Sequence, residues 1–389
     1  MPVRRGGYQQ LASAVNPSLR PSQEGTLQLI FFQVRRFHRA WILVSLTMSR
    51  PSTLSIVIRR IIGALPSILG VIIVTFVLTR ALPGDPAAYF AGPAASQEAI
   101  DQIRETLGLN RSLPEQFIIY VGELLRGDLG NSLTTGQTVV SDLLTRLPAS
   151  LELTLAGLVF SLTLALPLGI LAATRPGSWI DHGVRVLATA GVSLPTFFTG
   201  LLLIYVFYFL LGVAPAPLGR LAILYSPPDQ ITGLFLVDSL LAGDLETFRA
   251  ALGQLMLPAI TLGLFALAPL ARVTRAAMLS VLSSDFIRTA RASGLAPHTI
   301  LFGYAFRNAM LPVVTTLGVV FSFLLGANVL VEKVFAWPGI GSYAVSALIA
   351  SDYAAVQGFV LTMALLYVVL NLLIDLLYTV IDPRAGVES

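Results

Sequence analysis

The chain has 389 residues, of which 55% are apolar and only 12% are charged, whereas a soluble globular chain carries about 25% charged residues. This balance, with a mean hydropathy of +0.79, excludes an ordinary soluble domain and predicts a polytopic membrane protein. The net charge of +4 would suggest a nucleic-acid partner in a soluble chain, but here the basic residues follow the predicted membrane topology.

Residues 1–47 differ in composition from the rest of the chain. The stretch Leu27–Leu46 is apolar, but Arg35, Arg36 and Arg39 interrupt it, and each arginine at the centre of a membrane span costs about 3 kcal/mol. We therefore expect no span here. The segment is predicted to be an N-terminal extension, either an interfacial amphipathic helix or a stretch that precedes a start at Met48.

Six apolar runs are long enough to cross a bilayer, which takes about 20 residues in a helix. Their length and low charge predict an all-α protein of six membrane spans, with a lead-in and first span over residues 48–80 and a span core over residues 151–382. A tail, 383–389, follows the core. The predicted spans are Ile61–Thr79, Leu151–Ala173, Val186–Gly212, Ala251–Ala271, Ala309–Val331 and Val356–Ile381.

The distribution of basic residues predicts the orientation of these spans. If both termini lie in the cytoplasm, the inner segments hold 17 lysines and arginines and the outer segments hold 8. Cytoplasmic loops of membrane proteins are enriched in basic residues, so both termini are predicted to be cytoplasmic.

Two outer segments are long enough to hold structure of their own. Residues 81–150 begin with a rigid Leu82–Pro86 turn and continue into two short amphipathic patterns, Gln97–Leu107 and Pro114–Leu125, which predict a helical insertion. The second outer segment, Val213–Ala250, contains the half-apolar stretch Ile231–Leu241, which is too short to span.

The inner segment 272–308 is the most patterned loop of the chain. Residues 285–291 have helical spacing, and Gly294 is expected to end that helix. Such a short helix between two spans can dock into a groove on a partner protein. The alternative is a solvated loop whose charges are incidental.

Several kinds of chemistry are excluded or disfavoured. The chain has no cysteine, so disulfides and thiolate sites are excluded. Its three histidines, His38, His182 and His298, are far apart, and we predict no metal site. Its single lysine, Lys333, lacks the glycine frame of a phosphate-binding loop, and no hydrolase-like arrangement is present, so we predict that the chain is not an enzyme.

Three polar residues interrupt the apolar spans, namely Asn328, Asn371 and Asp375. Polar side chains at membrane depth are costly and often functional, so they are candidates for lining a pathway. Asn371 and Asp375 are four residues apart and share a helix face. Hydrogen bonding between helices is the alternative role.

Short motifs recur in a fixed order from Met48 onward. They include the Pro83–Pro86 turn, Ser193–Phe198 in the third span, Leu257–Ala259 in the fourth, the inner loop, and Phe335–Gly341 before the sixth span. In this order they resemble the permease subunits of ABC importers, in the dipeptide, oligopeptide and nickel branch, and there the first of two permease subunits. The loop departs from the general family motif, because Arg288–Ala290 stands where Glu-Ala-Ala is usual.

The resemblance implies a multi-pass protein of the bacterial inner membrane that forms half of a translocation pathway for peptides or related solutes. It implies a second homologous permease, two ATPase subunits that carry the ATP and Mg, and an extracytoplasmic solute-binding protein. The solute itself stays open among peptides, nickel, glutathione and opine-like compounds. An ion-coupled secondary transporter is the alternative function, although the spans hold few coupling charges.

The resemblance also implies roles for individual residues. Residues of the inner loop would couple the pathway to the ATPases, and these are Asp285, Arg288, Thr289, Ala290, Gly294, Arg307, Asn308 and Pro312. Residues of the outer loop between spans five and six would face the outer gate and the receptor, and these are Glu332, Trp337, Pro338, Gly339 and Gly341. For the prolines and glycines of this outer set, simple turn formation is the alternative.

Overall fold

The computed structural model describes residues 53–81, 86–91, 95–106 and 108–381. In this part of the chain the regular elements are helices, and one isolated β-bridge joins Asn131 to Thr138. The chain divides into two units, one of residues 56–385 and one of residues 1–55 with 386–389. The predicted extension 1–47 and the predicted tail 383–389 lie outside the described residues.

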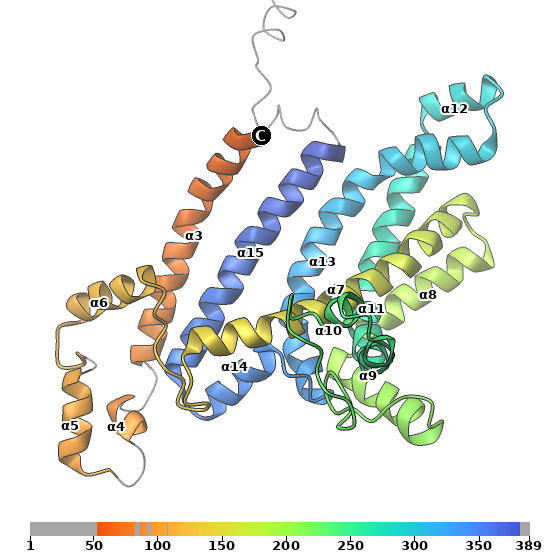
Figure 1. The fold of residues 1–389 in the computed structure, drawn as a ribbon. Helices are drawn as coiled ribbons and strands as arrows, with labels where there is room; N and C mark the ends of the chain where they lie inside the picture. The colour runs from red at the N-terminus through yellow and green to blue at the C-terminus, as the bar shows by residue number, and fades with distance from the viewer. Residues whose placement is uncertain (1–52, 82–85, 92–94, 107, 382–389) are drawn as a thin grey trace, which may run out of the picture. The chain divides into compact units, whose positions relative to one another are not determined.

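The predicted first span, Ile61–Thr79, lies within one helix, but the described apolar stretch of that helix, Ile62–Val77, is shorter than the helices that are long enough to cross a membrane. Short helices follow it in the predicted insertion. Ser112 and Glu115 form a capping box at the start of the last of them, with the Ser112 amide donating to the Glu115 carboxylate at 3.1 Å. That helix packs on the first through Phe117, whose ring meets the Phe76 ring edge-on at 5.2 Å. In chain order these helices are α3 (Thr53–Ala81), α4 (Pro86–Ala91), α5 (Gln97–Thr106) and α6 (Leu113–Leu125) (Figure 1).

Four stretches of helix in the described residues are long and apolar enough to cross a membrane. They confirm the predicted second, fourth, fifth and sixth spans. A helix of 36 residues is about 54 Å long at 1.5 Å per residue, so the longer ones extend beyond a hydrocarbon core of about 30 Å. The four are α7 (Val139–Thr174), α11 (Leu245–Leu282), the continuous η2–α13 (Thr299–Val334) and Tyr353–Ile374 of α15 (Tyr353–Ile381).

The ends of these helices differ from the ends of the predicted spans, because capping residues set where the helices begin. Helix α7 begins at Val139, twelve residues before the predicted span, because the Thr138 hydroxyl accepts from the Ser141 amide. Helix α11 begins after Asp244, whose carboxylate accepts from two backbone amides of the first turn. Helix α11 also runs on to Leu282, so the predicted inner loop 272–308 shortens to residues 283–298.

The prediction of one continuous third span over Val186–Gly212 is wrong. The structure has α8 (Trp179–Ser193), then α9 (Thr196–Leu203) and a π-helical turn η1 (Ile204–Leu210). The break lies at Leu194, whose φ of −100° and ψ of 136° are extended. The following Pro195 is the cause, since proline disfavours the helical conformation of the residue before it.

The core lies where α7 crosses α11. A Cβ added to Gly157 of α7 would lie 2.9 Å from the Leu262 Cβ, and one added to Gly169 would lie 2.7 Å from the Thr274 Cβ. Glycine at these positions lets the two backbones approach closely, as is common between membrane helices. The buried leucines and alanines of both helices, joined by Leu324 and Val331 of α13, fill this core.

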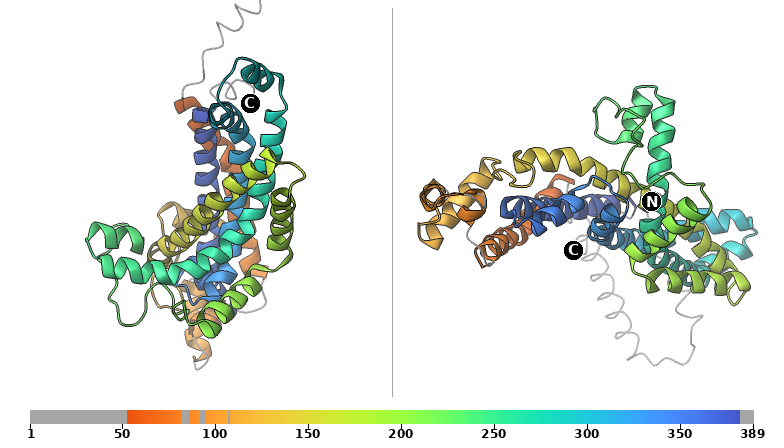
Figure 2. Two further views of the ribbon diagram at one scale, coloured as in Figure 1. Left: turned by 90° about the vertical axis from the view of Figure 1, so that its right-hand side faces the viewer. Right: turned by 90° about the horizontal axis from the view of Figure 1, so that it is seen from below.

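Two short helices flank α11 along the chain. Helix α10 (Phe235–Leu241) precedes it and α12 (Asp285–Ala292) follows it, and Figure 2 shows them near opposite ends of this long helix. A third short helix, α14 (Ile340–Ile349), joins α13 to α15 and packs on the start of α7 through Ile340 and Tyr343.

Candidate functional site

The predicted inner helix is present as α12, and its buried face rests on the ends of longer helices. Ile287 and Ala290 are its buried residues. They belong to a cluster that includes Ile170 of α7, Met278 of α11 and Ala309 of α13. Helix α12 therefore belongs to an apolar cluster that also contains residues near the ends of three of the four long helices.

The opposite face of α12 is open. Asp285, Arg288 and Thr289 are exposed, and the Asp285 carboxylate pairs with the Arg288 guanidinium at 3.1 Å across one helical turn. Gly294 follows with a φ of +75°, which glycine adopts without strain. It ends the helix as predicted. Of the predicted coupling residues in α12, Ala290 alone is buried.

The remaining predicted loop residues lie where the loop enters the fifth span. The chain passes through a π-helical turn η2 (Thr299–Phe306) directly into α13 (Arg307–Val334), so Arg307 and Asn308 form its first turn. Both are exposed, and the Asn308 amide donates to the Tyr304 carbonyl at 2.7 Å. Pro312 is also exposed. Like the open face of α12, these three residues are exposed at the surface.

The outer set of predicted residues is mostly buried. Glu332 has an exposed fraction of 0% and Trp337 of 1%. The Glu332 carboxylate accepts from the Ser150 hydroxyl and, at 2.7 Å, from the Ser342 amide. The Trp337 indole donates to the Ala149 carbonyl at 2.9 Å. These bonds join α7, α13 and α14 around one polar centre, which we call the Glu332 knot.

Two positions beside the Glu332 knot require glycine, because there is no space for a Cβ atom. A Cβ on Gly339 would lie 2.1 Å from a Glu332 carboxylate oxygen, and one on Gly341 would lie 2.8 Å from the Val329 Cα. Pro338 is the exposed residue of the predicted outer set. Tight packing thus accounts for these two glycines, and a role of the set toward a receptor stays a prediction.

Asn328, a predicted pathway residue, lies in the same buried region. Its amide donates to the Ser150 carbonyl and to the Thr154 hydroxyl, both at 3.1 Å, and its own oxygen has no partner in the described residues. Its exposed fraction is 2%. Asn328 therefore forms hydrogen bonds between α13 and α7.

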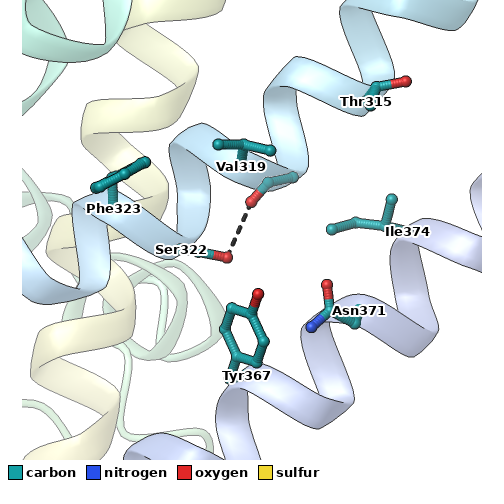
Figure 3. A pocket seen from close by; sticks show the side chains of 8 residues that line it. Thr315, Val319, Ser322, Phe323, Tyr367, Asn371 and Ile374 are labelled. Carbon is teal, nitrogen blue, oxygen red and sulfur yellow. Dashed lines mark hydrogen bonds between the residues drawn. The ribbon is translucent and has the colours of Figure 1, made fainter.

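Asn371, the second predicted pathway residue, lines a pocket between α13 and α15. The pocket has a volume of about 460 Å³, and Figure 3 shows Tyr367 and Asn371 projecting from α15 toward Ser322 of α13. Asp375 lies one turn further along α15, and its side chain is outside the described part of the structure. The pocket is lined by Thr315, Gly318, Val319, Ser322, Phe323, Tyr367, Asn371 and Ile374.

Two ion pairs, one buried and one half-buried, were not predicted, because pairs distant in sequence carry no periodic signal. Arg220 donates to Glu152 at 2.6 Å and to the Gly233 carbonyl at 2.8 Å, and its guanidinium stacks on the Phe235 ring at 3.4 Å. Burial lowers the pKa of Arg220, and the Glu152 carboxylate opposes that shift. The pair joins the segment before α10 to α7.

The second pair joins α8 to α11. Arg275 donates two hydrogen bonds to Asp181, at 2.5 and 2.8 Å. These bonds, with one from the Gly177 amide, hold the pKa of the Asp181 carboxyl well below its usual range. The carboxylate is thus kept charged. The ion pair connects α8 to α11, before the helical break at Leu194.

The described residues contain no cluster of three or more histidines, cysteines or acidic residues that could hold a metal ion. His182 and His298 are both exposed and lie on separate elements. His38 lies outside the described residues.

Comparison with known proteins places the chain in a family. Residues 165–387 match the family described as binding-protein-dependent transport system inner membrane component. Residues 53–154 match a second description, binding-protein-dependent transport system membrane component, N-terminal. The two matches together include the inner loop, the Glu332 knot and the pocket.

Individual relatives cover nearly the same length. The chain is 45% identical to the probable D,D-dipeptide transport system permease protein DdpB of Escherichia coli (strain K12), over 85% of this chain and 97% of that protein. It is 43% identical to the di/tripeptide transport system permease protein DppB of Pseudomonas aeruginosa (strain UCBPP-PA14), over 85% and 98%. Among solved structures, it is similar to an inward-facing MetNI methionine ABC transporter, with 19% identity and a TM-score of 0.44 over 60% of this chain and 93% of that one.

These matches decide between the two functions that the sequence left open, since an ion-coupled secondary transporter has no place in this family. The chain belongs to the binding-protein-dependent transport system inner membrane components, and it is a multi-pass inner-membrane permease subunit of an ABC importer and not its ATPase.

Proposed function

We propose that this permease forms half of the membrane pathway for short peptides, in preference to nickel, glutathione or opine-like solutes. The observation that carries the proposal is the similarity to permeases named for dipeptides, at 45%, 43% and 37% identity over 85% of the chain. Since the similarity extends over 97% or more of each relative, the whole pathway-forming region is compared.

The complete importer would contain a second homologous permease, two ATPase subunits and an extracytoplasmic solute-binding protein. The exposed face of α12, with Asp285 and Arg288, would contact one ATPase at the inner membrane surface. Both termini would then be cytoplasmic, in agreement with the excess of basic residues on that side. ATP and Mg would be bound by the ATPases.

Coupling would follow from the way α12 is attached. When ATP closes the ATPases, the two coupling helices of the permease pair would approach one another. Because Ile287 and Ala290 share one apolar cluster with residues near the ends of α7, α11 and α13, this motion would tilt the three spans together and open the outer side. Hydrolysis would reset the inward-open state, which is alternating access driven by a partner with two states.

The test is purification of the chain with its co-expressed partners in mild detergent, followed by reconstitution into proteoliposomes with the receptor. We expect two ATPase subunits and a second six-span permease to co-purify. We also expect ATP-dependent uptake of dialanine that persists when ionophores collapse all ion gradients at constant ATP. Nickel ions should neither be imported nor compete.

Three results would contradict the proposal in different ways. If this chain purifies alone and is still active in uptake, the proposed complex with a second permease and two ATPases is contradicted. Loss of uptake on gradient collapse would make the transport ion-coupled. Import of nickel in place of dialanine would leave the permease assignment intact and overturn the peptide solute.

A further inference from the structure

The pocket between α13 and α15 has an unusual composition for a cavity at membrane depth. Its volume of about 460 Å³ lies within the range of small-molecule sites. None of its lining side chains is charged, yet four of them carry a hydroxyl or an amide. Val319 and Tyr367 at its rim are 54% and 53% exposed, so the pocket opens to the surface of this subunit.

Two of the polar groups have no partner. Within the described residues, the Asn371 amide and the Tyr367 hydroxyl make no hydrogen bond, whereas the Ser322 hydroxyl donates to the Gly318 carbonyl at 3.0 Å. Figure 3 shows all three groups directed into the same space. An unpaired amide at membrane depth costs several kcal/mol, so this space is suited to a ligand that completes these bonds.

The lining selects a particular chemical group. The side-chain amide of Asn371 offers one acceptor and a donor pair, which match the N–H and C=O of a peptide bond. A charged group would find no counter-charge on any lining residue and would stay unpaired. Apolar surface from Val319, Phe323 and Ile374 is available for a small side chain.

We infer that the pocket holds the uncharged peptide bond of the transported solute. Asn371 is the residue that hydrogen-bonds to this peptide bond, and the charged ends of the solute lie outside the pocket. The inference rests on the proposed peptide solute and assigns a specificity-determining residue to the pathway. It implies that the pathway distinguishes an amide from an ester, independently of the receptor.

The experiment compares dialanine with alanyl-lactate, in which an ester oxygen replaces the peptide N–H. Both solutes are supplied together to proteoliposomes that contain the complete importer, and the ratio of their uptake is measured. Because the receptor is unchanged, its own preference cancels when the ratio of a variant is divided by that of the wild type. Loss of one hydrogen bond corresponds to about a 3- to 10-fold change in such a ratio.

We expect Asn371→Leu to lower the amide-to-ester ratio by this factor, because dialanine loses a hydrogen bond at its N–H that alanyl-lactate does not make. The control is Thr316→Val, which removes a hydroxyl bonded to its own helix one residue from the pocket-lining Thr315, and which should keep the wild-type ratio. If Asn371→Leu does not assemble, Asn371→Ser is measured in the same way.

The possible failures are distinct. An unchanged ratio, or an equal loss for both solutes, would overturn the inference. Loss of the second permease from purified Asn371 variants would show that a neighbouring subunit fills the pocket, and would also overturn it. Absence of both solutes from wild-type vesicles would instead overturn the peptide solute of the proposed function, and the inference with it.

Discussion

Single residues at the Glu332 knot show how a polar group can be essential at membrane depth without facing a pathway. The Glu332 carboxylate is fully buried and accepts hydrogen bonds from α7 and from the start of α14. The Ser150 hydroxyl that donates to it also accepts from the Ile340 amide at 2.9 Å. Removal of the carboxylate therefore leaves two donors without their acceptor.

Glu332→Leu is predicted to destabilise the subunit by about 2–5 kcal/mol, since the buried Ser150 hydroxyl and the half-buried Ser342 amide lose their acceptor. The measurement is the midpoint of thermal unfolding of the purified importer in detergent. Glu246→Gln, which neutralises an exposed carboxylate on α11, serves as the control and should not shift the midpoint. A midpoint for Glu332→Leu equal to that of the wild type would show that the knot is not needed for stability.

At the scale of elements, α12 has two different faces, one buried against the protein and one exposed. Its buried face, Ile287 and Ala290, fixes it to the longer helices, while Asp285 and Arg288 remain exposed. The exposed ion pair contributes at most about 1 kcal/mol, so its loss leaves the helix in place. Variants on this face therefore test contact with a partner and not folding.

Asp285→Arg is predicted to uncouple the importer, because it reverses the charge at the exposed start of α12. We expect solute uptake to fall several-fold while ATP hydrolysis continues, as measured by ATP consumed per solute imported. Uptake with the wild-type ATP requirement would contradict a coupling role for this face.

Gly294→Val tests the turn that ends α12. Gly294 has a φ of +75° and open space around its Cα, so the substitution costs backbone strain of about 1–2 kcal/mol and no steric clash. Gly127→Val is a matched control, because Gly127 has a φ of +78° and similar open space, in the segment that is predicted to lie on the outer side. Only the variant at Gly294 is expected to raise the ATP consumed per solute; an equal effect of both would assign the change to strain alone.

For the whole molecule, the orientation in the membrane follows from charge and can be measured directly. The chain has no cysteine, so a single introduced thiol reports its own position. Ser226 lies exposed in the segment between η1 and α10, and Ser293 lies exposed just after α12. These two segments are predicted to lie on opposite sides of the membrane.

Ser226→Cys is predicted to react with a membrane-impermeant maleimide in intact spheroplasts. Ser293→Cys should react only after permeabilisation, because the excess of basic residues keeps its loop in the cytoplasm. Labelling is measured by the mass shift of the purified chain. Reaction of Ser293→Cys from outside would invert the topology and with it the proposed ATPase contact.

Most helices of this protein were predictable because membrane helices are specified locally, by about 20 consecutive apolar residues. Helix α12 was predictable for the same reason, since its spacing and Gly294 lie within ten residues of one another. The prediction of the third span was wrong because a hydropathy average over about 20 residues does not detect a single proline. The conformation of Leu194 depends on its direct neighbour Pro195.

The amino-acid sequence by itself determined the class of protein, four of the spans and the presence of a patterned inner helix. Only the tertiary structure decided which polar residues act together. Ser150 and Glu332 are 182 residues apart, and Arg220 lies 68 residues from Glu152. The physical reason is that hydropathy and capping depend on neighbours along the chain, whereas burial and pairing of polar groups depend on which helices cross.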